Sequence, residues 1–235
     1  MKLPGFATRE GTDRYRRRFD GKIPREHFRS MNGLWTSSIG IGTYLGNHDD
    51  ATDKQYREAV VRAVESGCNV IDSAINYRCQ RSERSIGTAL KELATRGYGR
   101  DEVIVATKGG FLPFDGTPPS DPRSYFTKTF MDTGLAAAPD VVGGYHCMTP
   151  RYLSNQLDCS LRNLNLDCVD IYYLHNPESQ LAKVAREEFD VRLLKAFEAL
   201  EQAVASGKVR MYGTATWNAY RNPVDAKDYL SLAQV

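Results

Sequence analysis

The stretch Val169-Asp170-Ile171-Tyr172-Tyr173-Leu174-His175 is almost wholly apolar and aromatic and ends in a histidine. A short run of this composition predicts a β-strand. Amphipathic helix patterns stand on either side of it, over residues 149–164 and 191–206. An order in which strands and helices alternate is typical of a parallel sheet with helices packed outside it.

The alternation continues in both directions from this strand. Further strands are expected at 38–43, 69–74, 103–108 and 209–216, and further helices at 54–66, 83–96 and 223–235. Ser82 is the expected N-cap of the helix over 83–96. Five strands are fewer than the eight of a closed barrel. The sequence therefore predicts an α/β fold of the (β/α)8 TIM-barrel type that is incomplete, with about five of eight β/α units and open edges at the first and fifth strands.

Two regions depart from the regular alternation. Residues 1–36 are polar and rich in arginine, and we expect an N-terminal arm or hairpin there, before a partial barrel domain over 37–235. The arginines among residues 14–18 are flanked by aspartates and are expected to be solvated. The second region, about 109–148, is a long insertion rich in proline and glycine. It is too long for a plain loop, so we expect it to fold over the active-site face.

Composition excludes several classes of protein. The net charge of +2 gives no support for nucleic-acid binding. Five cysteines without CxxC spacing fit reduced thiols better than a disulfide framework or a zinc site, so no metal is expected. No apolar stretch is long enough for a membrane span, and the N-terminus has no apolar leader. These features predict a cytoplasmic protein.

Four residues combine the chemistry of proton transfer to a carbonyl oxygen. Asp72, Lys108 and His175 stand at the ends of predicted strands, and Tyr77 follows in the loop after Asp72. The carboxyl ends of barrel strands converge on one face, so the four side chains are expected to meet there. The strands of Asp72 and Lys108 are neighbours, which favours an ion pair. We expect Tyr77 to be the acid, with its pKa lowered by the ammonium, and His175 to bond the carbonyl oxygen.

Lys108 has other readings when it is considered alone. It could be a solvated lysine at a strand end, a Schiff-base lysine of an aldolase-type barrel, or an ion-pair partner that tunes an acid. Asp72 favours the last reading, because a lysine held by a carboxylate stays charged and is a poor nucleophile. For Tyr77 the competing interpretation is ordinary loop packing.

The residues around these four are similar to those of the aldo-keto reductases. The resemblance extends from about residue 33 to 220 and depends on the order and spacing of several segments together. These segments are Gly40-Ile41-Gly42-Thr43-Tyr44, residues 70–77, Ser82-Glu83-Arg84-Ser85-Ile86-Gly87, Val105-Ala106-Thr107-Lys108, residues 170–177 and Gly207-Lys208-Val209-Arg210.

The resemblance implies a catalytic tetrad of Asp72, Tyr77, Lys108 and His175, with Tyr77 as general acid. It also implies hydride transfer between NADP(H) and an aldehyde or ketone. The implied cofactor contacts are Thr43, Tyr44, Asp72 and Thr216, and the implied substrate contacts are Tyr44 and Asn176. Family members hold the nicotinamide carboxamide with a Ser-Asn pair at the end of the fifth strand, where this chain has Ala215-Thr216.

The resemblance also implies three further β/α units, which would carry most of the cofactor site. We therefore expect the sequence to be an N-terminal fragment of a longer reductase. Three alternatives stay open: a catalytically weak or regulatory nucleotide-binding barrel, an inactive fragment of a longer reductase, and an unrelated lysine-dependent aldolase barrel. The sequence identifies neither the carbonyl substrate nor the oligomeric state.

Overall fold

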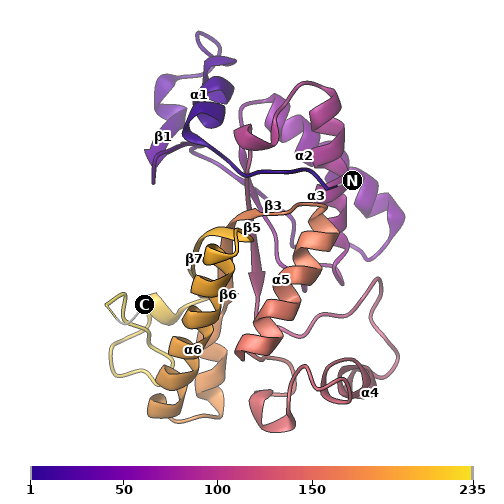
Figure 1. Cartoon of the computed structure of the whole chain (residues 1–235), viewed down its shortest axis with the longest axis vertical. Coiled ribbons are helices and arrows are strands. Elements are labelled where there is room, and N and C mark those ends of the chain that lie inside the picture. Colours follow the sequence, from indigo (N-terminus) through magenta and orange to yellow (C-terminus); the bar gives the residue numbers. More distant parts are fainter. Residues whose placement is uncertain (1, 234–235) are drawn as a thin grey trace.

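The computed structural model describes residues 2–233, and its centre is one parallel β-sheet (Figure 1). The sheet has five strands in the order β3-β4-β5-β6-β7, and each pairs in parallel with the next. Their bounds are β3 Ile41–Gly42, β4 Val70–Asp72, β5 Ile104–Gly109, β6 Val169–His175 and β7 Val209–Ala215. The carboxyl ends of all five strands therefore lie along the same edge.

Helices connect the strands and cover one face of the sheet (Figure 1). The α-helices are α1 Arg9–Arg17, α2 Asp50–Glu65, α3 Arg81–Thr95, α4 Pro122–Phe126, α5 Pro150–Leu164 and α6 Arg186–Ala205. Shorter helical segments, of 3-10 or π type, are Arg25–His27, Arg100–Glu102, Thr127–Met131, Ala138–Asp140, Pro177–Ala182 and Ala219–Arg221. The predicted fold class, an incomplete α/β barrel, is confirmed.

The main core lies between the sheet and helices α2, α3, α5 and α6, and it includes Val60, Leu90, Leu157 and Leu200. Gly87 permits close packing of α3 on α5, because a Cβ there would come within 2.6 Å of the carbonyl oxygen of Asn163. A smaller apolar cluster lies on the other face of the sheet and is made by Ala7, Leu34, Ile104, Ala106 and Ile171. The N-terminal region therefore covers part of the inner face.

Several element boundaries differ from the prediction. The first strand keeps only two residues, and α6 begins at Arg186, because its acidic first turn extends the helix beyond the apolar pattern. Ser82 is not an N-cap but lies inside α3, where its hydroxyl donates to the Thr43 carbonyl oxygen at 2.6 Å. The helix expected from residue 223 is absent from 223–233, which form turns, and residues 234–235 lie outside the described part.

The N-terminal region contains a helix that the sequence did not predict. Helix α1 precedes an antiparallel hairpin of β1 Phe28–Met31 and β2 Leu34–Ser37. Arg14 and Arg18 both pair with Glu102, whose side chain is fully buried. The two arginine side chains stay 51% and 35% exposed, so they are partly solvated as expected, and their ion pairs also join α1 to the amino end of the sheet.

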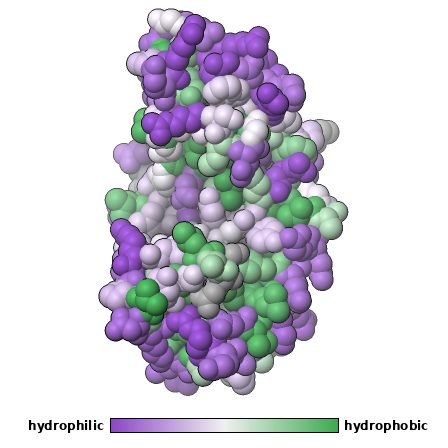
Figure 2. Space-filling view, turned by 90° about the vertical axis from the view of Figure 1, so that its left-hand side faces the viewer, coloured by the Kyte–Doolittle hydropathy of each residue, from purple (hydrophilic) through white to green (hydrophobic). Residues whose placement is uncertain are grey.

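Strands β3 and β7 are the edges of the sheet, as expected from five strands. After Val209, the residues of β7 are half-buried or exposed, whereas those of β5 are buried throughout. Figure 2 views the molecule from the side on which β7 lies and shows apolar patches between polar regions. Large exposed apolar residues near the end of the described chain are Trp217, Val224 and Leu232.

Candidate active site

Strand alternation brings the three predicted strand-end residues to one face. Asp72, Lys108 and His175 end or nearly end β4, β5 and β6. Lys108 shares its strand parity with Ile104 and Ala106, which belong to the cluster on the inner face. Asp72 lies opposite Ala106 in the register of β4 and β5. The three side chains therefore emerge on the inner face, at the carboxyl edge.

Lys108 is the centre of the site. Its ammonium donates to Asp72 Oδ1 at 2.5 Å, to the Ser73 carbonyl oxygen at 2.7 Å and to Tyr77 Oη at 3.3 Å. An ammonium has three N–H donors, so these three bonds use its whole capacity. The Lys108 side chain is only 8% exposed, whereas that of Asp72 is 41% exposed. The pair is therefore open to solvent on the side of the carboxylate.

Burial determines the protonation of the site. It raises the pKa of Tyr77 to about 12, with a smaller contribution from the negative charge of Asp72. The prediction of a lowered Tyr77 pKa is therefore wrong in this structure, because burial and the charge of Asp72 raise it. Burial also lowers the pKa of Lys108, and the neighbouring Asp72 opposes that effect. Tyr77 is consequently a phenol, not a phenolate, at neutral pH.

His175 is held as a neutral imidazole. Burial, with the nearby Lys108 charge, lowers its pKa to about 3. Its ring meets the Tyr77 ring edge-on, with centroids 5.7 Å apart, and the Phe111 ring at 4.8 Å. Nδ1 is buried and has no hydrogen-bond partner among residues 2–233. A proton on Nδ1 would therefore be unbonded, which favours the tautomer with its proton on Nε2.

A second histidine, which the sequence did not single out, fixes the backbone of the first. His146 is buried and lies in the long insertion, and its Nε2 is 2.8 Å from the His175 carbonyl oxygen. Gln180 Nε2 donates to its Nδ1 at 2.8 Å, so His146 Nε2 must carry the proton and donate. Gly110, with φ of +146°, leaves room for this contact, because a Cβ there would lie 2.8 Å from His146 Nε2. The sequence gives no signal for His146, because the residue lies inside an irregular insertion.

The loop after Tyr77 is strained. Arg78, Cys79 and Gln80 follow it with φ angles of 49°, 55° and 68°, all in the left-handed region. Each non-glycine residue in that region costs roughly 1–2 kcal/mol, and such residues usually occur singly. Strain of this kind persists only where the surroundings impose it, and it is common at functional sites. Periodicity in the sequence gives no indication of this turn.

The predicted cofactor contacts differ in what they present. The Thr43 hydroxyl is fully buried and donates within the protein, to Ser73 Oγ at 3.0 Å. Tyr44 is 59% exposed, and its ring lies 5.0 Å from that of Tyr77. Asp72 and Thr216 are half-buried, at the ends of β4 and β7. Tyr44, Asp72 and Thr216 therefore keep exposed surface at the strand ends, whereas the Thr43 hydroxyl is used within the protein.

A cavity of about 440 Å³ lies beyond the carboxyl ends of β6 and β7, and its lining includes none of Asp72, Tyr77, Lys108 and His175. Asn176, the predicted substrate contact, lines it together with Tyr145 and Trp217. Tyr145 stacks on Phe111, which touches His175. Other aromatics of the insertion pack against one another instead, with the rings of Phe114 and Phe126 stacked at 4.8 Å.

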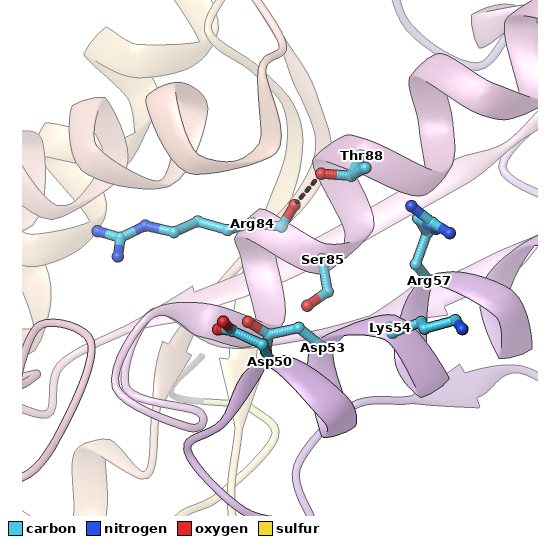
Figure 3. Close-up of a pocket in the computed structure, with 7 residues that line it drawn as sticks. All are labelled: Asp50, Asp53, Lys54, Arg57, Arg84, Ser85 and Thr88. Atoms are coloured by element: carbon cyan, nitrogen blue, oxygen red, sulfur yellow. Dashed lines mark hydrogen bonds between the residues drawn. The ribbon is translucent and has the colours of Figure 1, made fainter.

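A different groove, of about 280 Å³, lies between helices α2 and α3 (Figure 3). Its charged side chains are matched in ion pairs, such as Arg84 with Asp115 and Lys54 with Glu58.

All five cysteines of the chain are free thiols, and four of them are buried. Within residues 2–233, no helix has the length and apolar character needed to cross a bilayer.

A model of the aldo/keto reductase family matches residues 38–226. The chain belongs to this family. It is 30% identical over 183 residues to a D-threo-aldose 1-dehydrogenase from a Pseudomonas species, which covers 77% of this chain and 50% of that protein.

Solved structures show the same fold. An aldo-keto reductase from Bacillus halodurans in its holo form matches with a TM-score of 0.55, 23% identity and coverage of 80% of this chain and 50% of that one. An aldo-keto reductase from Klebsiella pneumoniae in complex with NADPH matches with a TM-score of 0.50, 23% identity and coverage of 79% and 47%. The chain spans about half the length of these relatives.

Proposed function

We propose that this chain carries the carbonyl-reducing site of an NADP(H)-dependent aldo-keto reductase, with Tyr77 as general acid. One observation supports the role of Tyr77 most strongly. Lys108 donates a hydrogen bond to Tyr77 Oη, so the phenol accepts from the ammonium and its own proton is free for a substrate oxygen. This polarity is the one that a proton donor needs.

The residues present fit the nicotinamide end of the cofactor. Tyr44, Asp72 and Thr216 stand at the carboxyl edge, with the Tyr44 ring against that of Tyr77, and the Klebsiella relative is in complex with NADPH. A bound reduced nicotinamide supplies the hydride. Ala215 has no polar side-chain atom, so the hydroxyl of Thr216 is the group at the end of β7 that can bond the carboxamide.

The four residues then divide the work of reduction. His175, as a neutral ring with its proton on Nε2, orients the carbonyl oxygen of an aldehyde or ketone. As the carbonyl carbon is reduced, its oxygen would take the Tyr77 proton, which would yield the alcohol. A developing alkoxide is a stronger base than a phenolate, so a raised phenol pKa still permits the transfer. The Lys108 ammonium stabilises the phenolate that remains.

The aldolase alternative requires a neutral Lys108 amine with a free lone pair. The three hydrogen bonds of the Lys108 ammonium oppose that state. Borohydride trapping with an aldehyde separates the two functions, because a Schiff base gives a covalent adduct on Lys108. We expect no adduct. An adduct that forms on the unaltered chain and is absent from Lys108→Met would favour an aldolase over a reductase.

The direct test is reduction of benzaldehyde with NADPH deuterated at the transferable position, with mass analysis of the alcohol. The proposal predicts deuterium on the alcohol carbon, and no deuterated alcohol when NADPH is left out. NADPH binding without deuterium transfer would instead indicate a nucleotide-binding barrel that does not turn over.

The buried free thiols are consistent with the proposed cytoplasmic location.

A further inference from the structure

The strained turn after Tyr77 is anchored on two sides. On the side of the insertion, the Gly116 amide donates to the Cys79 carbonyl oxygen at 2.9 Å, and Gln80 Nε2 donates to the Phe114 carbonyl oxygen at 3.1 Å. Asn163 on α5 donates to Gln80 Oε1 at 3.1 Å. These contacts hold the end of the turn that leads into α3.

Arg78 anchors the other side, which is nearest to Tyr77. Its side chain is 1% exposed and reaches the segment between β3 and α2. Nε donates to the Asn47 carbonyl oxygen at 2.8 Å, and Nη2 donates to the Asp49 carbonyl oxygen at 3.4 Å. Nη2 also pairs with Asp53 on α2 at 2.6 Å, and the guanidinium lies over the Tyr56 ring at 5.0 Å.

An arginine at this position is expensive for the protein. The left-handed backbone favours glycine, and a buried guanidinium loses its hydration. Its Nη1 atom is buried and has no partner among the described residues. The bonds that the side chain makes must therefore offset both penalties, and those bonds join two loops that border the site.

The two joined loops carry the two tyrosines of the site. One bears Tyr44, and the other begins with Tyr77, and their rings meet edge-on at 5.0 Å and 62°. Tyr56 adds a second bond to the first loop, from its hydroxyl to the Leu45 carbonyl oxygen at 2.6 Å. Tyr77 Oη lies at the outer limit of hydrogen bonding to Lys108, so a small outward shift would break that bond.

We propose that Arg78 is a positioning residue for the general acid. It clamps the left-handed turn to the Tyr44 loop and thereby holds Tyr77 Oη within reach of Lys108. Its role in catalysis rests on the proposed function, whereas the clamp itself concerns only the position of Tyr77. The two parts can therefore be tested separately.

Arg81 provides a matched control. It shares Asp53 with Arg78 and also pairs with Asp50, but its side chain bonds no backbone atom of the Tyr44 loop among the described residues. Figure 3 shows Asp50 and Asp53 side by side on α2, beside the groove next to α3. Arg81→Met therefore removes a similar charge from the same acidic pair and leaves the clamp intact.

The structural test uses the full chain labelled with 3-fluorotyrosine and read by fluorine NMR. The Tyr77 resonance is assigned by its loss in Tyr77→Phe. We expect it to shift or broaden in Arg78→Met and to stay in place in Arg81→Met. An unmoved Tyr77 resonance in Arg78→Met overturns the clamp, whatever the activity of the protein. If Arg78→Met does not fold, Arg78→Lys is measured instead, because lysine keeps the charge but its single nitrogen cannot take the places of both Nε and Nη2.

The catalytic test compares rates of NADPH-dependent benzaldehyde reduction. A misplacement of about 1 Å costs roughly 100-fold in rate, so we expect kcat of Arg78→Met to fall by about that factor while KM changes little. Arg81→Met keeps the bonds of Arg78 to the Tyr44 loop, so its rate should stay close to that of the unaltered chain. Equal losses of rate in Arg78→Met and Arg81→Met would show that Arg78 has only a structural role. If the Tyr77 resonance moves in Arg78→Met but the unaltered chain has no reductase activity, the clamp is supported and the proposed function is contradicted.

Discussion

Two ion pairs lie at opposite ends of the sheet. At the amino end, Arg100 pairs with Asp170 at 2.6 Å, and the side chains are 5% and 1% exposed. At the carboxyl end, Lys108 pairs with Asp72 at 2.5 Å, and Asp72 is 41% exposed. Both pairs place a cation beside a carboxylate, yet only the second one is open to a ligand.

The partners of each pair explain the difference. Asp170 also accepts from the amides of Ala7 and Val105, at 2.6 and 2.8 Å, so its carboxylate is saturated by fixed backbone groups. The ammonium of Lys108 donates one of its three hydrogen bonds to Tyr77, whose hydroxyl has a proton of its own. A saturated pair stabilises the fold, whereas a pair shared with an acid can support chemistry.

The largest effect is expected at the open pair. Lys108→Met removes the cation beside Tyr77, and carbonyl reduction should fall by about 1,000-fold, within the range for a lost acid–base group. Stability should change little, because Asp72 can be hydrated once it is unpaired. Steady-state rates and urea unfolding measure the two quantities. A strong loss of stability together with a modest loss of rate would reverse the assignment of the pairs.

Asp170→Asn should produce the opposite result. Breaking a buried ion pair leaves an uncompensated charge and costs about 3–5 kcal/mol in the free energy of unfolding. The rate of the folded fraction should be unchanged, since Asp170 lies at the far end of β6 from His175. Urea midpoints and rates at low temperature test both statements. Full stability in the variant would show that the closed pair does not hold the sheet.

His146 sharpens the comparison through pH. Burial lowers its pKa to about 4, so protonation favours the unfolded chain, in which the value is near 6.5. Its contribution to stability is present above pH 6.5 and is lost as the pH falls toward about 4, which amounts to about 3 kcal/mol. His146→Gln should therefore flatten the acid side of the stability profile. An unchanged acid profile would contradict the neutral, bonded state of His146.

The smallest effect is expected at an exposed pair. Lys208 and Asp158 are 2.7 Å apart, and their side chains are 42% and 43% exposed. Lys208→Ala should change the free energy of unfolding by less than about 1 kcal/mol, because solvent screens such pairs. A loss as large as that of Asp170→Asn would mean that exposure does not distinguish the pairs.

Much of this molecule could be predicted from sequence periodicity. The apolar run ending in His175 matched β6 to the residue, and neighbouring strands brought Lys108 to Asp72. The environment of Tyr77 could not be predicted in the same way, because its raised pKa depends on burial by distant residues. Helix α1 was missed because its pattern is polar, and His146 and Arg78 because their contacts come from irregular loops.

The most direct test of the proposed site is Tyr77→Phe, which removes one hydroxyl and keeps the ring that packs against Tyr44 and His175. NADPH affinity by fluorescence titration and benzaldehyde reduction are measured on the same protein, with circular dichroism as the check on folding. We predict an unchanged affinity and a rate lower by about 100- to 10,000-fold. A folded Tyr77→Phe protein that still reduces the aldehyde at the original rate would show that Tyr77 is not the acid.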